Sequence, residues 1–439
     1  MKKIILAGAA FALAAAAFSQ EARGPWTLEE CISWAQEHNI SVRQAGLAVR
    51  QAEVELNTSQ NSRLPDLNAS AGENFSFGRG LTYENTYANT NTTSTSFSIG
   101  SSVPVFNGMR IKHQILQDRL NLEAASADLE KMRDDIRLSV AQAYYQTLYN
   151  KEILGIAMRQ VEIDSLQLDR LIDIEKAGKA SQVEVAQQKA ALGNSRLSAT
   201  QARINLQVAL LDLSQLLELP SPEGFDTVDF TPSDPDFMLP SPEMVYADAL
   251  GYRPAIHAGE TRLKAIDENL AVAKSYFYPS LSLSGGVGTN YYTTSGINNG
   301  SFADQMKNNF SQYIGINLSI PIFNKFSIRN SVRSVELSRL NQELELENTR
   351  KSLYKEIQQA YYNAEAAARR FESSSAALAS AKESYDLMEA KYQSGKANIT
   401  EYLQARSTWL EAQSNLSQAR YEYLYQAGLL DFYRTPSRH

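Results

Sequence analysis

The sequence predicts a mainly α-helical protein with a β-barrel part, built from two copies of one structural repeat. Three observations carry this prediction. The chain aligns with itself, each copy contains a very long proline-free segment, and each copy contains two segments in which apolar and polar residues alternate. Self-similarity on this scale organises a whole fold. Alternation predicts strands, and apolar residues spaced by three and four predict helices.

The first 19 residues have the pattern of a secretory signal peptide. Lys2 and Lys3 precede an apolar core, and Ala17-Phe18-Ser19 supplies the small residues that signal peptidase recognises. The alternative is a retained membrane anchor, but the core is short for a span of about 20 residues. We therefore expect residues 1–19 to be removed and the exported chain to begin at Gln20.

Composition limits the remaining possibilities. The formal net charge of −7 argues against nucleic-acid binding as the main function. Cys31 is the only cysteine and has no lipobox before it, so neither a disulfide nor a lipid anchor is expected. Beyond the signal segment no apolar stretch of about 18 residues occurs, so an integral membrane protein must cross the bilayer as strands.

Four pairs of matched segments define the duplication. LEECISWAQEHNISV (28–42) matches PEMVYADALGYRPAI (242–256) at a shift of 214 residues that also aligns Pro65 with Pro279, and the later pairs match at a shift of 217. SVPVFN (102–107) matches SIPIFN (319–324), and AGKA (177–180) matches SGKA (394–397). Ala143-Tyr144-Tyr145 likewise matches the Ala-Tyr-Tyr that begins at Ala360. We expect a first repeat, a proline-rich equatorial connector without helix, a second repeat and a C-terminal tail, at 20–218, 219–241, 242–433 and 434–439.

Each copy reads as helix, two strands, very long helix and helix. Residues 108–176 and 325–394 contain no proline and carry apolar residues at helical spacing. At about 1.5 Å per residue, each helix would run roughly 100 Å, which indicates a coiled coil or a helical barrel. Shorter helices are expected to stack in pairs beside the long ones, at 27–62, 181–217, 242–276 and 397–432.

Four segments alternate as strands with one lipid-facing side should. The apolar sides contain Leu67, Ala69, Ala71, Phe75, Phe77; Phe97, Ile99, Val103, Val105; Leu281, Leu283, Val287; and Ile314, Ile316, Leu318, Ile320. Polar loops are expected at 79–92 and 291–309, with an aromatic girdle of Tyr83, Tyr87, Tyr291 and Tyr292. The alternative is a soluble sheet with one buried side. Because four strands cannot close a membrane barrel, a homo-oligomer is required, and a dimer or a larger ring is compatible with the residues.

The duplication, the strand-end prolines and the segment SYDLMEAKYQSGKANITEYLQA (384–405) resemble the TolC-like outer-membrane efflux family. The segment is similar to the family's helix-turn-helix tip, although Glu401-Tyr402-Leu403 and Glu184-Val185-Ala186 replace the common Asp-Val-Leu. The resemblance implies a homotrimeric duct with a 12-stranded outer-membrane β-barrel and a long periplasmic α-helical barrel. It also implies contact with outer-membrane lipid, a periplasmic adaptor (membrane fusion protein) and an inner-membrane pump in an efflux or type I secretion system.

The residues offer no catalytic site. His38, His113, His257 and His439 lack the spacing of helical metal ligands, and Cys31 has no neighbouring base. AGKA and SGKA lack the remainder of a phosphate loop. We therefore expect no enzyme activity, metal or cofactor.

Two candidate sites follow from the repeat and the resemblance. Gly178, Lys179, Gly395 and Lys396 are expected at helix-ending turns, where glycine adopts the left-handed conformation, and the resemblance makes them candidates for adaptor docking. Asp169, Asp386 and Glu389 lie shortly before these turns. Repeated around a ring, their carboxylates would form a cation-selective constriction, and the alternative is a solvated helix face.

Two other function classes remain possible from the residues. An outer-membrane coiled-coil stalk or adhesion protein has no need of a strand pair in each copy, and a periplasmic enzyme needs a nucleophile and base that were not found. Single-channel conductance in a planar bilayer separates these classes from a channel.

Overall fold

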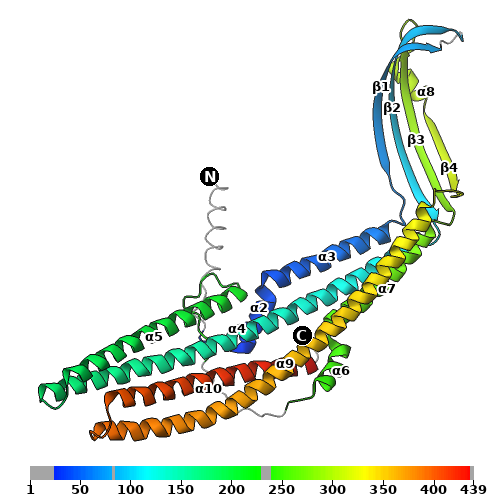
Figure 1. Cartoon of the computed structure of the whole chain (residues 1–439). Coiled ribbons are helices and arrows are strands. Elements are labelled where there is room, and N and C mark those ends of the chain that lie inside the picture. The colour runs from blue at the N-terminus through cyan, green and yellow to red at the C-terminus, as the bar shows by residue number, and fades with distance from the viewer. Residues whose placement is uncertain (1–23, 82–84, 229–238, 436–439) are drawn as a thin grey trace, which may run out of the picture. The chain divides into compact units, whose positions relative to one another are not determined.

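The computed structural model describes residues 24–81, 85–228 and 239–435 (Figure 1). The predicted signal peptide 1–19, its cleavage before Gln20, and Tyr83 lie outside the described residues. So do the centre of the predicted connector (229–238) and the last four residues with His439. Among the described residues, no helix is both long and apolar enough to span a membrane.

The helices and strands follow the same order in both copies, except that the second copy has an additional short helix, α8, between its strands. The first copy contains α2 (Leu28–His38), α3 (Ile40–Asn61), β1 (Asn68–Leu81), β2 (Tyr87–Phe106), α4 (Arg110–Lys176) and α5 (Gln182–Leu216). The second contains α6 (Pro242–Tyr252), α7 (Pro254–Ser275), β3 (Ser280–Thr294), α8 (Phe302–Asn308), β4 (Ser311–Ser319), α9 (Ser327–Gln393) and α10 (Ile399–Arg434). The predicted long helices are present, and α4 and α9 have 67 residues each.

The chain divides into two compact units. One contains the described residues of Met1–Leu47, Ala127–His257 and Asn348–His439, and we call it the hairpin unit because it holds the α4–α5 and α9–α10 turns. The other contains Ala48–Ser126 and Ala258–Glu347, and we call it the strand unit because it holds the sheet.

The predicted single helices at 27–62 and 242–276 are each broken, and this part of the prediction was wrong. The breaks fall at Asn39 and Arg253, which match each other in the two copies and have extended backbones. Pro254 explains the second break, because proline disfavours helical geometry in the residue before it. At the first break, the Asn39 side chain accepts a hydrogen bond from Ser41 N at 2.9 Å and so replaces a helical bond.

Both break residues also cap another helix. Asn39 Nδ2 donates to the Leu216 carbonyl at the end of α5 (3.0 Å), and the Arg253 guanidinium donates to the Phe432 carbonyl near the end of α10. These carbonyls have no partner within their own helices. Arg253 also pairs with buried Asp134 at 3.1 Å. Burial lowers the pKa of Arg253, and the neighbouring Asp134 carboxylate opposes that effect.

Two apolar clusters form the core of the hairpin unit. The first packs α2 against α4 and α5 around Cys31, Val140 and Leu213. The second packs α6 against α9 and α10 around Val245, Ile357 and Leu430. The Cys31 side chain is therefore part of the apolar core, and burial raises the pKa of its thiol to about 12.

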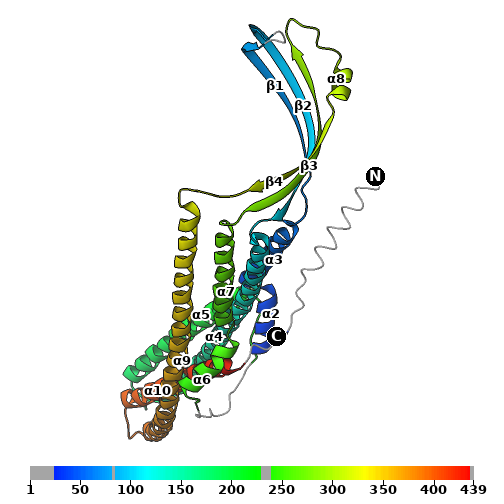
Figure 2. The ribbon, with the colours of Figure 1, turned by 90° about the vertical axis from the view of Figure 1, so that its right-hand side faces the viewer.

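The strand unit contains one antiparallel sheet in the order β1-β2-β3-β4 (Figure 2). Ile99 stands opposite both Ala69 and Val287, and Leu283 stands opposite both Val103 and Ile316. The predicted apolar sides of the four strands therefore form one common face. Two details differ from the predicted loops. Strands β1, β2 and β3 extend into them, and α8 forms within 291–309, where the Thr289 hydroxyl donates to the Met306 carbonyl at 2.7 Å.

Candidate functional site

The turn between α4 and α5 closes the first helical hairpin. Gly178 has a φ of 71°, and its N–H donates to the Glu175 carbonyl at 2.7 Å. The Lys179 N–H donates to the Ile174 carbonyl at 3.0 Å. These two bonds form a Schellman motif, which satisfies carbonyls at the end of α4 and requires a left-handed residue at the glycine.

The turn between α9 and α10 has the same geometry. Gly395 has a φ of 72°, and its N–H donates to the Tyr392 carbonyl at 3.0 Å. The Lys396 N–H donates to the Lys391 carbonyl at 2.8 Å. Both glycines and both lysines are exposed, and a Cβ added at either glycine would meet no atom within 4 Å.

Each turn continues directly into a capped helix. Ser181 and Glu184 form a capping box at the start of α5, and Asn398 and Glu401 form one at the start of α10. In a capping box the two side chains satisfy each other's backbone N–H groups. We call residues 177–181 and 394–398 the two tips. Because each tip is short and lies between a capped helix end and a capped helix start, its backbone has a defined conformation. Exposed Lys179 and Lys396 project from these two backbones.

Below the first tip lies a buried polar cluster, which sequence reasoning missed. The Asp164 carboxylate on α4 is fully buried and pairs with the Arg406 guanidinium on α10. It also accepts hydrogen bonds from Gln188 Nε2 (3.1 Å), Gln160 Nε2 (3.0 Å) and the Ser195 hydroxyl. One signal was present in the sequence: Asp164 stands where the second copy has Ala381.

The hairpin unit arranges its long helices in the order α5-α4-α10-α9. Gln188 joins α5 to α4, the Asp164–Arg406 pair joins α4 to α10, and Arg370 of α9 pairs with Glu422 of α10 at 2.7 Å. This order leaves α5 and α9 at the two edges (Figure 1).

The three predicted constriction residues lie on two helices that are separated by α10. Asp169 on α4 and Asp386 on α9 are exposed, and Glu389 on α9 is half-buried. Asp386 pairs with Lys382 at 2.5 Å on the same helix face. Within one chain the structure therefore does not bring the two aspartates together, and the constriction stays a prediction.

The apolar face of the sheet is exposed along all four strands. Phe77 on β1 is 75% exposed, Ile99 on β2 is 48% exposed, and Ile314 on β4 is 86% exposed. A sheet in water would bury such a face against a second layer. The opposite face carries small polar residues, for example Ser98 opposite Ser70 with their hydroxyls 2.7 Å apart. One face therefore suits lipid and the other suits water.

No group of three or more histidine, cysteine or acidic side chains within 24–81, 85–228 and 239–435 is arranged to hold a metal ion. The sheet and the helical hairpins instead have the features of a membrane-channel subunit: one lipid-compatible face, one small polar face and long helices that continue from the strands.

Comparison with known proteins identifies the family. Residues 31–218 and 245–430 match the Outer membrane efflux protein family, and the chain belongs to it. Outer membrane protein TolC of Salmonella enteritidis is 24% identical over 396 residues, which cover 88% of this chain and 77% of the relative. Pyoverdine export outer membrane protein OpmQ of Pseudomonas aeruginosa is 27% identical over 392 residues, which cover 85% and 77%.

The fold is shared with solved structures of such proteins. The outer membrane protein VceC of Vibrio cholerae aligns with a TM-score of 0.77 at 18% identity, and the alignment covers 94% of this chain and 97% of that chain. The protein is therefore a TolC-like outer-membrane efflux channel subunit with a long periplasmic portion. The predicted channel class is confirmed, and the stalk or adhesion alternative is not favoured.

Proposed function

We propose that three copies of the chain close into one duct, that the two tips bind a periplasmic adaptor, and that an inner-membrane pump supplies the cargo. The observation that carries the ring is the sheet with two unpaired edges, at β1 and β4. Within a bilayer, unpaired backbone groups at a sheet edge cost several kcal/mol each, so the edges must pair with another chain. Pairing β1 of one copy with β4 of the next removes every edge.

The helices of the strand unit support the same ring. Their order is α3-α4-α7-α9, joined by Ser59 with Asp118, His113 with Glu268, and Arg339 with Asp267. The two edge helices carry exposed apolar side chains, namely Val54 on α3 and Leu337, Leu340 and Leu344 on α9. Two different apolar edges on one chain fit a head-to-tail ring.

The hairpin unit also has two different edges. Its α5 edge carries an exposed stripe at the spacing of one helix face, formed by Leu197, Ile204, Val208 and Leu211. Its α9 edge carries exposed Leu387. A head-to-tail contact would cover α5 of one copy with α9 of the next. The number three comes from the resemblance to the family.

Disulfide cross-linking tests the ring. In a Cys31→Val background, which copies the matching Val245, cysteines are placed at Leu387 and at Ala190, which is exposed on the same face of α5 as Leu197 and nearly level with Leu387. The pair is expected to give a ladder that ends at the mass of three chains. Ala190→Cys alone is the control and should give no ladder. A ladder that ends at two chains would overturn the trimer, and no ladder above one chain would overturn the contact.

Exposed lysines on a defined backbone support adaptor docking at the tips. Lys179→Cys and Lys396→Cys are expected to cross-link to a periplasmic protein in cells, whereas Lys355→Cys, an exposed position on α9 away from the tips, should not. Labelling of the tip cysteines from outside intact cells would contradict the proposal.

OpmQ is named for pyoverdine export, and we propose for this chain a passive passage whose cargo is chosen by its pump.

We also propose that the carboxylates near the tips line the narrowest part of the duct. Three copies would bring Asp169, Asp386 and Glu389 around one axis, and converging carboxylates favour cations. Asp169→Asn with Asp386→Asn is expected to reduce cation selectivity and block by divalent ions in planar-bilayer recordings. Glu372→Gln, an exposed carboxylate on α9 about 20 Å from Asp386 along the helix, serves as the control. Unchanged selectivity in the double variant would mean that these carboxylates form only a solvated face.

A further inference from the structure

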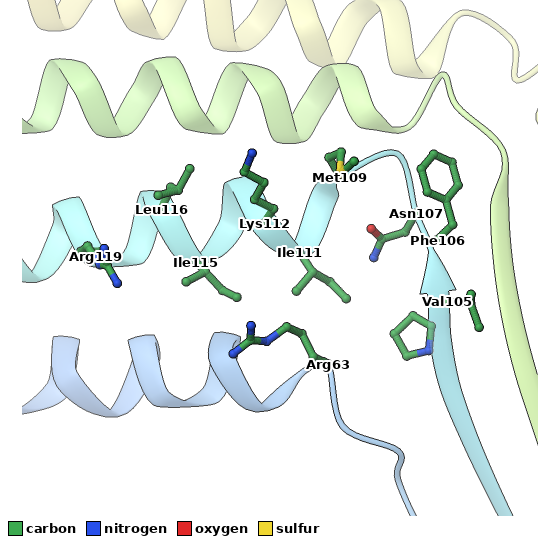
Figure 3. A pocket seen from close by; sticks show the side chains of 11 residues that line it. Arg63, Val105, Phe106, Asn107, Met109, Ile111, Lys112, Ile115, Leu116 and Arg119 are labelled. Atoms are coloured by element: carbon green, nitrogen blue, oxygen red, sulfur yellow. The ribbon is translucent and has the colours of Figure 1, made fainter.

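A pocket lies in the strand unit where β2 meets α4 (Figure 3). Its volume is about 450 Å³, and its walls come from the end of α3, the end of β2 and the first turns of α4. Figure 3 shows Ile111 and Ile115 directed from α4 towards α3, with Arg63 reaching into the same space. The pocket thus has an apolar floor of Val105, Ile111 and Ile115 and a charged border.

The charged border is entirely cationic. Arg63, Lys112 and Arg119 line the pocket, and no carboxylate is among its lining residues. All three side chains are exposed, and the part of the chain that the structure describes contains no ion pair to any of them. The Arg63 Nε–H donates to the Gln60 carbonyl at 3.0 Å, which directs the guanidinium without neutralising it. Such a border attracts an anion.

A second observation points to the same ligand chemistry. Asn107 lines the pocket, and its Nδ2 group is buried without a hydrogen-bond partner among the described residues. A buried donor left unpaired costs about 1–3 kcal/mol, and it is satisfied when a ligand oxygen enters. The pocket therefore has an amide donor at its β2 end and three cations further along its border, a set that fits a phosphate group and the ester oxygens attached to it.

The position of the pocket indicates which kind of molecule carries the phosphate. The pocket lies where the strands end and the helices begin, and exposed aromatic side chains mark this level at Phe106, Tyr278 and Phe323. Aromatic residues gather at the headgroup level of a membrane. In an outer-membrane channel with periplasmic helices, this level faces the phospholipid leaflet. Basic pockets at such a level bind lipid headgroups.

The second copy of the repeat provides an internal comparison. Arg63 and Arg119 match Phe277 and Glu336 there, whereas Lys112 matches Arg329. The apolar floor is kept, with Ile322 and Ile328 in place of Val105 and Ile111. The fold itself therefore does not require a cation at the positions of Arg63 and Arg119, and the full set of three belongs to the first copy alone.

We propose that this pocket binds one anionic glycerophospholipid per chain. Its phosphate lies near Arg63 and Lys112, Arg119 adds positive charge about 10 Å further along α4, and an ester oxygen of the lipid accepts the hydrogen bond of Asn107 Nδ2. The first part of an acyl chain covers Val105, Ile111 and Ile115. Phosphatidylglycerol binds more tightly than phosphatidylethanolamine, because the ammonium group of the latter opposes the three cations.

Native mass spectrometry of the purified full-length protein tests the proposal, with phosphatidylglycerol added in a phosphate-free detergent. Each cation near an anionic lipid contributes roughly fivefold to binding. Lys112→Gln with Arg119→Gln is therefore expected to weaken phosphatidylglycerol binding by roughly 25-fold. Arg329→Gln with Arg333→Gln removes the same charge at the same level of the second copy and should leave binding within about twofold.

Two further measurements separate the possible occupants. Asn107→Leu is expected to weaken phosphatidylglycerol binding severalfold, since it removes the amide donor at similar volume. Inorganic phosphate at millimolar concentration should not displace the lipid. Equal losses of phosphatidylglycerol affinity in the two double variants would mean that surface charge in general binds the lipid, and this would overturn the proposal. Full displacement of the lipid by inorganic phosphate would also overturn it. Unchanged single-channel conductance in the variants shows that the duct itself is intact.

Discussion

The two helical hairpins have the same tips and different interiors. Each tip combines a Schellman glycine with a capping box, at Gly178 and at Gly395. Below the tips, the α9–α10 hairpin packs aromatic rings, with Tyr385 stacked on Trp409 at 4.8 Å and Tyr392 stacked on Tyr402 at 5.0 Å. The matching positions of the α4–α5 hairpin are Leu168, Leu192, Glu175 and Val185.

The polar clusters differ in the same way. Asp164 and Gln188 match Ala381 and Ala405, and Arg406 matches exposed Lys189. The conformation of a tip is therefore determined by its own backbone, whereas the side chains inside a hairpin depend on the helix packed against it. Asp164 is tolerated because α10 lies beside it and supplies Arg406. A buried charge without such a partner is strongly destabilising.

The largest loss of stability is expected when one partner of the Asp164–Arg406 pair is removed. Arg406→Met should lower the free energy of unfolding by about 3–5 kcal/mol, because it leaves the Asp164 carboxylate buried and unpaired. Urea unfolding followed by helical circular dichroism measures the change. Lys189→Met, the matched exposed position, should stay within about 0.5 kcal/mol. Asp164→Ala with Arg406→Met removes both buried charges and should recover most of the loss. A double variant as unstable as Arg406→Met would contradict the explanation.

The second largest loss of stability is expected at one of the two strand-to-helix junctions. Gly108 and Met109 adopt positive φ angles, as do the matching Lys325 and Phe326. Only Gly108 is also confined, since a Cβ there would lie 2.7 Å from the Ser275 carbonyl oxygen. Gly108→Ala should therefore cost about 3 kcal/mol, from backbone strain together with overpacking. Limited proteolysis and urea unfolding would reveal it, and a change below about 1 kcal/mol would show that the junction relaxes.

Equal effects are expected at the two tips. Gly178→Ala and Gly395→Ala should each cost about 1 kcal/mol, because both glycines have φ near 70° and open space around them. Urea unfolding of the two variants measures both values in one experiment. Unequal losses would mean that the tips differ in their surroundings, for example through contact with a neighbouring chain.

The smallest effect is a gain. Lys325→Gly relieves a left-handed conformation at a non-glycine residue, and the more flexible unfolded chain offsets part of that relief. We expect a net stabilisation of about 0.5 kcal/mol by urea unfolding. Asn85 also has a positive φ, but asparagine tolerates that region, so Asn85→Gly serves as the control with a smaller gain. A loss of stability in Lys325→Gly would show that the Lys325 side chain makes a useful contact.

Sequence reasoning identified the features that depend on nearby residues. The tip glycines were predicted because a Schellman turn needs only a left-handed residue and two local hydrogen bonds. The shared apolar face of the sheet was predicted because side chains alternate along any strand. Pro254 is also a local signal for the break at Arg253, because proline disfavours helical geometry in the residue before it.

Features that join distant parts of the chain needed the tertiary structure. The partner of Asn39 is the Leu216 carbonyl, and the partner of Asp164 is Arg406, so neither contact is visible from local spacing. The pocket at the start of α4 likewise unites Arg63, just after α3, with Lys112 and Arg119 of α4.

By itself, therefore, the sequence determined the duplication, the long helices, the alternating strands and the glycine turns, because each rests on backbone preference and on residue spacing along one segment. The tertiary structure alone decided which buried charges are paired, where the shorter helices break and which cations share a pocket. Those outcomes depend on which helix lies beside which, and burying a charge or an unpaired donor is costly until packing brings its partner.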